Sequence, residues 1–214
     1  MSEIASPAKG LPGRKAQAAR NDGIILAAAR EVFLADPGAP IAAVAERAGV
    51  GISALYRRYA SKEVLLRTLC YEGLCRYNAE AEAALDNSDD WTVLVEFLRR
   101  VVDADVHSLT VRLAGTFTPD ESFVPQVQRS GELNDEIIRR ARASGRLRAG
   151  ATAQDLGLIL ESCAAITAPD PARTAELRRR VLAVLIDGLT VGGELPGPPP
   201  RPGEFAQRWQ RPGR

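Results

Sequence analysis

The residues of this sequence that are best suited to chemistry gather in one short stretch, residues 45–63, which reads AERAGVGISALYRRYASKE. Tyr56, Arg57 and Arg58 carry hydrogen-bond donors that suit phosphate oxygens and the edges of bases. Lys62 stands at the expected start of the following helix, where unpaired backbone N–H groups and the helix dipole favour an anion. A lysine there is unfavourable for the dipole unless a phosphate lies beside it. The stretch therefore indicates a surface that contacts nucleic acid.

Two short helices are expected to position these side chains. The first spans about residues 41–48 and the second about residues 52–59, with Gly49 between them able to adopt a left-handed conformation. This pattern predicts a helix-turn-helix, which presents its second helix outward. Ser53 and Ala54 are small enough to let the N-terminus of that second helix approach a groove closely. The alternative is an ordinary helical hairpin with a solvated basic face.

Helical periodicity continues through most of the chain. Ser61 is suited to cap a helix from residue 62 to about 85, and Asp89 or Asp90 is suited to cap the next one. The later helical segments are a looser region over residues 108–144, broken near 118–119, and two apolar helices at about 152–168 and 172–191. Alternating apolar and polar runs long enough for a strand are missing, so the sequence predicts an all-α fold.

Composition divides the chain into four parts. Residues 1–19 are predicted to form a flexible basic arm, and residues 192–214, rich in proline and glycine, a disordered or extended tail. Between them lie a helix-turn-helix domain over residues 20–66 and a second helical domain over residues 67–191. The net charge is +1, but up to Lys62 there are nine Lys and Arg against five Asp and Glu, so the positive charge is concentrated at the front.

Several classes of protein are disfavoured. The chain has one histidine and three cysteines without metal-binding or redox spacing, so we expect no metal site and no cofactor. A nucleophile elbow, a phosphate loop and a dinucleotide fingerprint are all missing, so we expect no catalytic residues and no enzyme. No apolar run is long enough to span a membrane and the N-terminus lacks a secretory signal, so a cytoplasmic location is expected.

The stretch from residue 20 to residue 66 resembles the DNA-binding domain of the tetracycline-repressor (TetR) family of bacterial regulators. The resemblance rests on an Ala48-Gly49-Val50 turn, a Leu55-Tyr56 pair, an aromatic residue three positions later, and a Ser61-Lys62-Glu63 start to the fourth helix. It implies that the protein is a homodimeric regulator, most often a repressor, which binds double-stranded operator DNA and responds to a small-molecule effector. The positions that it implies for DNA contacts are Ile52, Ser53, Ala54, Tyr56, Arg57, Arg58 and Lys62.

The resemblance further implies that the last two helices pair with their counterparts as a four-helix bundle. The apolar residues expected at that dimer interface are Leu156, Ile159, Leu160, Cys163, Leu177, Val181, Leu185 and Leu189. The alternative is that these stripes only complete the core of one chain.

Four residues are candidates for lining an effector pocket. Asp105 falls on the apolar stripe of the fifth helix and His107 lies near the end of that helix, where a polar group is costly unless it meets a partner, a ligand or water. Trp91 and Phe117 are large aromatics that can line a cavity, although aromatics at helical spacing usually belong to the core. Asp105 has a second interpretation as a solvated residue at a helix end.

Together these features predict an all-α, dimeric, ligand-responsive transcriptional regulator, most often a repressor, with an N-terminal helix-turn-helix domain and a C-terminal domain for effector binding and dimerisation. The alternative from another class is a protein-interaction module that keeps the helix-turn-helix only as a scaffold.

Overall fold

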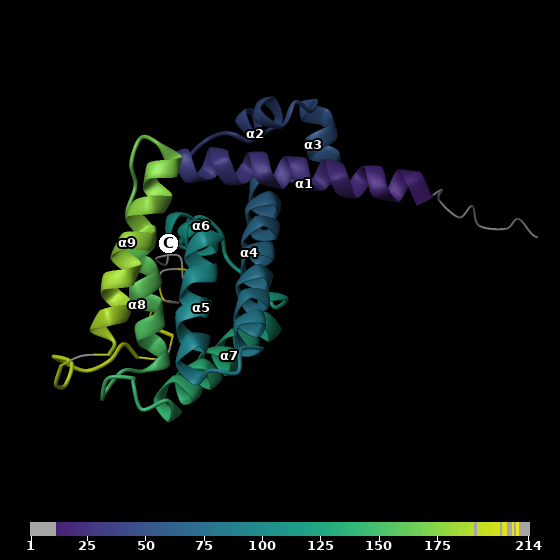
Figure 1. The fold of residues 1–214 in the computed structure, drawn as a ribbon. Helices are drawn as coiled ribbons and strands as arrows, with labels where there is room; N and C mark the ends of the chain where they lie inside the picture. The colour runs from purple at the N-terminus through teal and green to yellow at the C-terminus, as the bar shows by residue number, and fades with distance from the viewer. Residues whose placement is uncertain (1–11, 191, 202, 205–206, 208, 210–214) are drawn as a thin grey trace, which may run out of the picture. The chain divides into compact units, whose positions relative to one another are not determined.

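A computed structural model of the chain describes residues 12–190, 192–201, 203–204, 207 and 209. Within these residues the chain forms nine α-helices and no β-strand (Figure 1), which confirms the predicted all-α class. The helices are α1 (Pro12–Ala35), α2 (Ile41–Ala48), α3 (Ile52–Arg58), α4 (Lys62–Leu85), α5 (Asp90–Asp103), α6 (Val106–Leu113), α7 (Phe123–Ala143), α8 (Ala153–Ala164) and α9 (Pro171–Gly188).

The chain divides into two compact units, Met1–Leu65 and Leu66–Arg214. In the first unit α1 packs against α2, and α2 packs against α3. Phe33 of α1, Val44 of α2 and Leu55 of α3 are all fully buried in this unit. One apolar side chain from each helix therefore holds the helix-turn-helix together, and the opposite face of α3 stays exposed.

The turn between α2 and α3 depends on Gly49. This residue has φ of 64°, in the left-handed region that a side chain disfavours, and it ends α2. Its N–H donates to the carbonyl of Glu46 at 3.1 Å, and the N–H of Val50 donates to the carbonyl of Ala45 at 3.0 Å. The left-handed glycine thus satisfies the last carbonyls of α2 and lets the chain reverse into α3.

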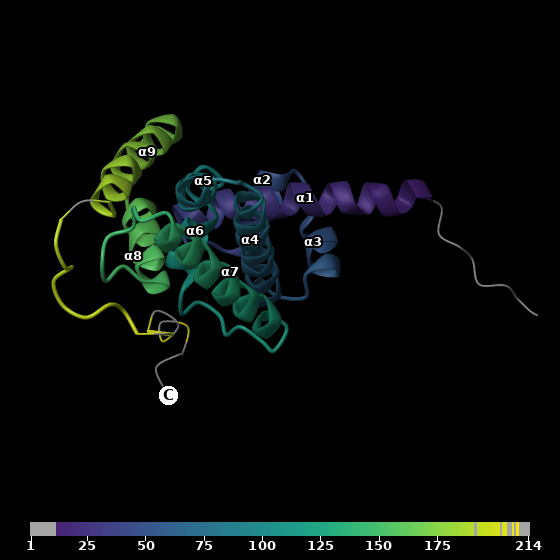
Figure 2. The ribbon, with the colours of Figure 1, turned by 60° about the horizontal axis from the view of Figure 1, so that its bottom comes forward.

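The second unit is built around α5, which packs against α7, α8 and α9. Buried Leu94, Phe97, Leu98 and Val101 supply its apolar surface. Figure 1 shows α8 and α9 running beside each other and α7 near the base of the bundle, and Figure 2, in which that base is turned forward, shows α7 in the foreground. None of the helices in the described part of the chain is long and apolar enough to cross a bilayer.

Local caps explain where most helices begin. The Ser61 hydroxyl accepts from the N–H of Val64 at 3.2 Å, and Asp89 accepts from the N–H of Thr92 at 2.7 Å. Thr152 and Asp155 form a capping box at the start of α8. These are the polar side chains that commonly occupy such positions, so the starts of α4 and α5 agree with the sequence prediction.

Other boundaries differ from the prediction. Helix α1 begins at Pro12, so part of the segment expected to be a flexible arm is helical, and the rest of that arm lies outside the described residues. Proline suits the first turn of a helix, and the alanines, arginines, lysine and glutamine that follow favour helix continuation. Pro125 stands in the first turn of α7, where its missing N–H has no cost, so it starts that helix without kinking it.

Candidate functional site

One face of α3 is buried and the other is exposed. Leu55 and Tyr59 point inward and are buried, as their spacing predicts, while Tyr56 on the opposite face is 48% exposed. Ser53 and Arg57 are also exposed. This surface therefore offers hydroxyl groups and a guanidinium to a partner without any change in the packing of the helix.

The remaining predicted contact positions on α3 differ in exposure. Ile52, at the start of the helix, is 40% exposed, and Ala54 is half-buried. Arg58 is exposed, but its guanidinium donates two hydrogen bonds to the carboxylate of Asp22 on α1. The bond from Nε to Oδ1 measures 2.6 Å. The bond to Asp22 also raises the pKa of Arg58. Arg58 thus ties α3 to α1 in addition to presenting positive charge.

Lys62 has a structural partner that the sequence did not reveal. Its ammonium donates to the carbonyls of Pro37 at 3.0 Å and Ala39 at 2.7 Å, and it lies 5.1 Å from the centre of the Phe33 ring. Two of its three N–H donors therefore join the loop after α1 to the start of α4. The half-buried ammonium holds the helix-turn-helix together, and any contribution to phosphate binding comes on top of that role.

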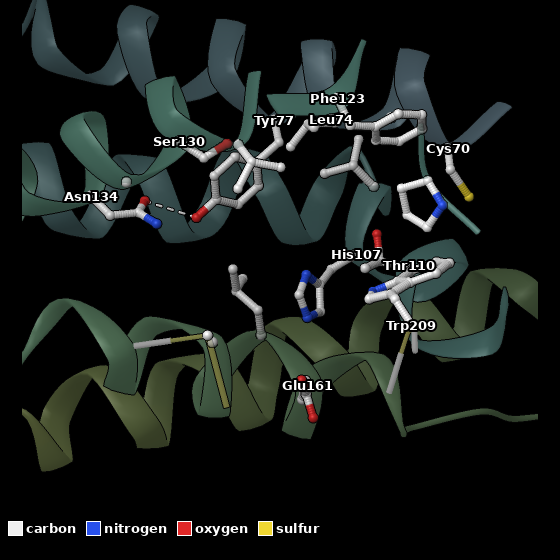
Figure 3. A pocket seen from close by; sticks show the side chains of 18 of the residues that line it. Cys70, Leu74, Tyr77, His107, Thr110, Phe123, Ser130, Asn134, Glu161 and Trp209 are labelled. Atoms are coloured by element: carbon white, nitrogen blue, oxygen red, sulfur yellow. Dashed lines mark hydrogen bonds between the residues drawn. The ribbon is translucent and has the colours of Figure 1, made fainter. Parts of the chain in front are cut away.

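The second unit contains a cavity of about 740 Å³. Its walls come from α4, α6, α7, α8 and the chain after α9, and Figure 3 shows Leu74, Tyr77 and Phe123 facing His107 and Glu161 across it. Most of the lining is apolar. The large apolar and aromatic side chains among the lining residues are Leu74, Tyr77, Val106, Phe117, Phe123, Val127, Leu160 and Trp209.

A small number of polar groups interrupt this wall. The Tyr77 hydroxyl donates to Oδ1 of Asn134 at 2.8 Å, and burial raises the pKa of Tyr77, so its phenol stays neutral. Burial also raises the pKa of the Cys70 thiol to about 12. Thr110 and Ser130 add hydroxyls. The cavity therefore offers a ligand an apolar surface with a few fixed hydrogen-bonding groups.

The four residues proposed from sequence for an effector pocket separate into two pairs. His107 and Phe117 line the cavity. Trp91 lies in the apolar core with the Arg146 guanidinium 4.9 Å from its ring, and it is not among the lining residues. Asp105 is also outside the cavity. Tyr77 and Phe123, which were not among the four, are large aromatics of the same kind as Phe117, whereas no sequence signal distinguishes Leu74 or Asn134 from other helix residues.

Asp105 is part of a polar junction between helices. It lies between α5 and α6 with φ of 50°, a left-handed conformation that aspartate tolerates better than most residues. Its carboxylate accepts from Nη1 of Arg178 at 2.5 Å and from the Ser108 hydroxyl. Buried Arg178 also donates to the carbonyls of Ala164 at 3.2 Å and Ile166 at 3.0 Å. The group thus joins α9 to the end of α8 and to the α5–α6 turn.

We expect Arg178→Met to lower the free energy of unfolding by about 1–3 kcal/mol, because a half-buried carboxylate and two carbonyls lose a donor. Urea unfolding followed by circular dichroism measures this change. Arg179→Met is the matched control, since Arg179 is exposed and its 2.7 Å bond to Asp103 is a surface ion pair with little effect on stability. Equal midpoints for the two variants would contradict the role assigned to Arg178.

Five of the eight residues expected at a dimer interface are buried inside the chain itself. They are Leu156, Ile159, Leu160, Cys163 and Leu189. The other three, Leu177, Val181 and Leu185, are half-buried. Two apolar residues that were not predicted, Leu158 on α8 and Val184 on α9, are 43% and 65% exposed. The uncovered apolar face of this helix pair therefore differs from the face that the sequence suggested.

No three side chains of histidine, cysteine, aspartate or glutamate gather to hold a metal ion among the residues whose positions are given. Comparisons with known proteins support a different kind of site. Residues 25–69 match the family model described as bacterial regulatory proteins, tetR family, and residues 89–191 match the one described as transcriptional regulator SbtR-like, C-terminal domain. A comparison with curated proteins gave no match.

Solved structures of TetR regulators resemble most of the chain. A TetR transcription regulatory protein from Mycobacterium vanbaalenii has a TM-score of 0.57 and 26% identity, covering 83% of this chain and 99% of its own. The TetR regulator SCO0520 from Streptomyces coelicolor has a TM-score of 0.58 and 22% identity, and the match covers 79% of this chain and 98% of that regulator. The TetR-family regulator PfmR from Thermus thermophilus has a TM-score of 0.60 and 21% identity, and the match covers 77% of this chain and 98% of PfmR.

Proposed function

The chain belongs to the TetR family of DNA-binding transcriptional regulators, which are not enzymes, and from that premise we propose that it binds a palindromic operator as a homodimer and is released by a small-molecule effector. The family binds operator DNA and small-molecule ligands. The finer proposal depends on three features of this chain: the exposed face of α3, the uncovered face of α8 and α9, and the cavity in the second unit.

The exposed face of α3 supports the operator contacts. Tyr56 is suited to a phosphate contact because its side chain is exposed and ends in a hydroxyl that can donate a hydrogen bond. A contact of this kind fixes the position of the protein on DNA without reading the base sequence. Arg57 has a planar guanidinium that can pair with the O6 and N7 atoms of a guanine, so it is our choice for reading sequence. Arg58, bonded to Asp22, holds α3 against α1. Lys62, bonded to two carbonyls of the loop after α1, holds the start of α4 and adds positive charge beside the DNA.

The other contact positions lie at the N-terminus of α3. Ser53 is exposed, Ile52 is partly exposed and Ala54 is half-buried, and all three are short enough for the helix end to enter a major groove. Ile52 can contact a thymine methyl group, and Ser53 can hydrogen-bond a phosphate or a base edge. These contacts would add sequence preference to that of Arg57.

Dimerisation is proposed through α8 and α9, because a palindromic site needs two recognition helices related by a two-fold axis. The exposed residues Leu158 and Val184 mark the centre of the proposed interface, flanked by half-buried Leu177, Val181 and Leu185. The five residues buried inside the chain are left out of this interface. They instead give α8 and α9 a rigid backing, on which the two exposed side chains can be covered by a second copy.

The cavity is the proposed effector site. Its volume of about 740 Å³ falls within the range of small-molecule pockets, and its wall is mostly apolar with a few hydrogen-bonding groups. The walls include α4, which starts directly after the helix-turn-helix, and α8, which belongs to the proposed dimer interface. A ligand that separates these helices would change the spacing of the two recognition helices, which is the physical basis for release from the operator.

Binding of the full chain to the DNA upstream of its own gene tests this proposal most directly. We expect fluorescence anisotropy at physiological salt to show at least about a thousandfold preference for that DNA over a scrambled duplex. Affinity for both duplexes should fall as salt rises, because phosphate contacts release counterions. Equal and weak affinity for the two duplexes would instead favour the alternative, a protein-interaction module that keeps the helix-turn-helix as a scaffold.

A further inference from the structure

The chain that leaves α9 is fixed in place by Arg148. The guanidinium donates from Nε to the carbonyl of Gly193 at 2.6 Å and from Nη1 to the carbonyl of Gly188 at 3.3 Å. It also packs against Gly192, where an added Cβ would lie 3.0 Å from Nη2 and where φ is 100°. The positive φ favours glycine at this position, and the two hydrogen bonds from Arg148 hold the chain just after α9.

Proline then limits the conformations of the tail. Residues 195–200 read LPGPPP, in which each proline fixes its own φ, and the chain bends at residues 196–197, where Gly197 has φ of 76°. Leu195 packs against the core of the second unit. Further on, the N–H of Arg201 donates to Oε2 of Glu204 at 2.7 Å, and Gly203 has φ of 75°. The described part of the tail thus bends at residues 196–197 and turns again at residues 203–204.

The described residues of the tail reach the effector cavity. Arg201, Gly203 and Trp209 are among the residues that line it, and Figure 3 shows the indole of Trp209 among the side chains of the wall. The Trp209 ring lies 5.1 Å from the ring of Phe117, with an interplanar angle of 62° that is typical of an edge-to-face contact. Phe117 is fully buried and touches Phe123 in turn, at 6.4 Å. Trp209 therefore continues an aromatic cluster that is anchored in the second unit.

We propose that the C-terminal tail is a built-in competitor for the effector pocket, in which Trp209 occupies space that an effector must take. This inference rests on the proposed function of the cavity. Because the tail is tethered to α9, its local concentration at the cavity is set by the chain and does not fall on dilution. A competing conformation reduces the apparent affinity of a ligand by the fraction of molecules in which the site is open. The tail therefore sets the effector concentration at which the regulator responds.

The test compares full-length variants with 1-anilinonaphthalene-8-sulfonate, a probe with aromatic rings and one anionic sulfonate whose fluorescence rises when it binds an apolar site. Trp209→Ala removes the competing ring, and Gln207→Ala is the matched control, because Gln207 is an exposed residue of the same segment. We expect the probe to bind the Trp209→Ala variant about threefold to tenfold more tightly than the wild type, from the free energy of an edge-to-face pair. Gln207→Ala and Trp209→Phe, which keeps a ring at this position, should remain within about twofold.

A second measurement reports directly on displacement. The chain has two tryptophans, so a protein labelled with 5-fluorotryptophan gives two fluorine resonances, which the Trp209→Phe variant assigns. Saturation with the probe should move the Trp209 resonance toward the position of free indole and leave that of buried Trp91 in place.

Each contrary outcome has a separate meaning. Equal or weaker binding by Trp209→Ala, or a Trp209 resonance that stays in place while the probe binds, would overturn the competitor role and leave the cavity as a ligand site. Failure of the probe to bind any variant would overturn the cavity as a ligand site, and the role of the tail with it.

Discussion

The substitution Val184→Glu should convert the proposed dimer into a monomer. Val184 is 65% exposed on α9, so Val184→Glu leaves the core of the single chain intact. In the proposed two-fold interface it would bury one carboxylate from each copy, and an unpaired buried charge costs several kcal/mol. Specific operator affinity should fall by about a hundredfold or more, because each monomer keeps only one half-site. Sedimentation velocity and fluorescence anisotropy measure the two effects.

The matched control for this variant is Val124→Glu. Val124 is a similarly exposed valine, at 51%, on α7, outside the proposed interface. Both variants should unfold at the temperature of the wild type, which would separate loss of assembly from loss of folding. A Val184→Glu protein that sediments as an unchanged dimer would show that the interface lies elsewhere on the chain.

Local interactions made much of the fold predictable. Gly49, Ser61 and Asp89 act within a few residues of their own positions, so their types and spacing were enough to place the starts or ends of α2, α4 and α5. The start of α1 lacked such a signal. Its first residues are compatible with a helix without carrying the apolar periodicity that would have identified one, so the sequence suggested an arm.

The site depended more on contacts between distant segments. Asp105 and Arg178 are 73 residues apart, so the periodicity around Asp105 could not show that its carboxylate accepts a hydrogen bond from an arginine of α9. The partners of Lys62 were also hidden from the sequence, because its ammonium donates to two carbonyls of the loop after α1, more than 20 residues earlier in the chain. An apolar stripe on a helix also does not indicate whether the same chain or a second copy covers it. The stripe of α8 with Leu156 and Leu160 was compatible with a dimer and with a core, and packing within the chain buries it.

Replacing Arg57 by alanine should weaken operator binding by about 1–3 kcal/mol at each half-site and relax the preference at one base pair there. Arg57 is exposed on the same face of α3 as Ser53, and no hydrogen bond or ion pair to it lies within the described residues, in contrast to Arg58 and Lys62. Its removal should therefore leave the stability of the helix-turn-helix unchanged. Anisotropy titrations with the operator and with single-base variants measure the loss and locate the base pair.

The control separates recognition of the base sequence from contacts to phosphates that only position the protein on the DNA. Tyr56→Phe removes only a hydroxyl from an exposed side chain, so it should weaken binding to the operator and to a scrambled duplex by the same factor. Lys62→Ala is a poorer control, because it also removes the two hydrogen bonds that hold the start of α4. A loss for Arg57→Ala that is equal on both duplexes would place Arg57 among the phosphate contacts. Base reading would then fall to Ile52, Ser53 and Ala54, whose short side chains allow the N-terminus of α3 to enter the major groove.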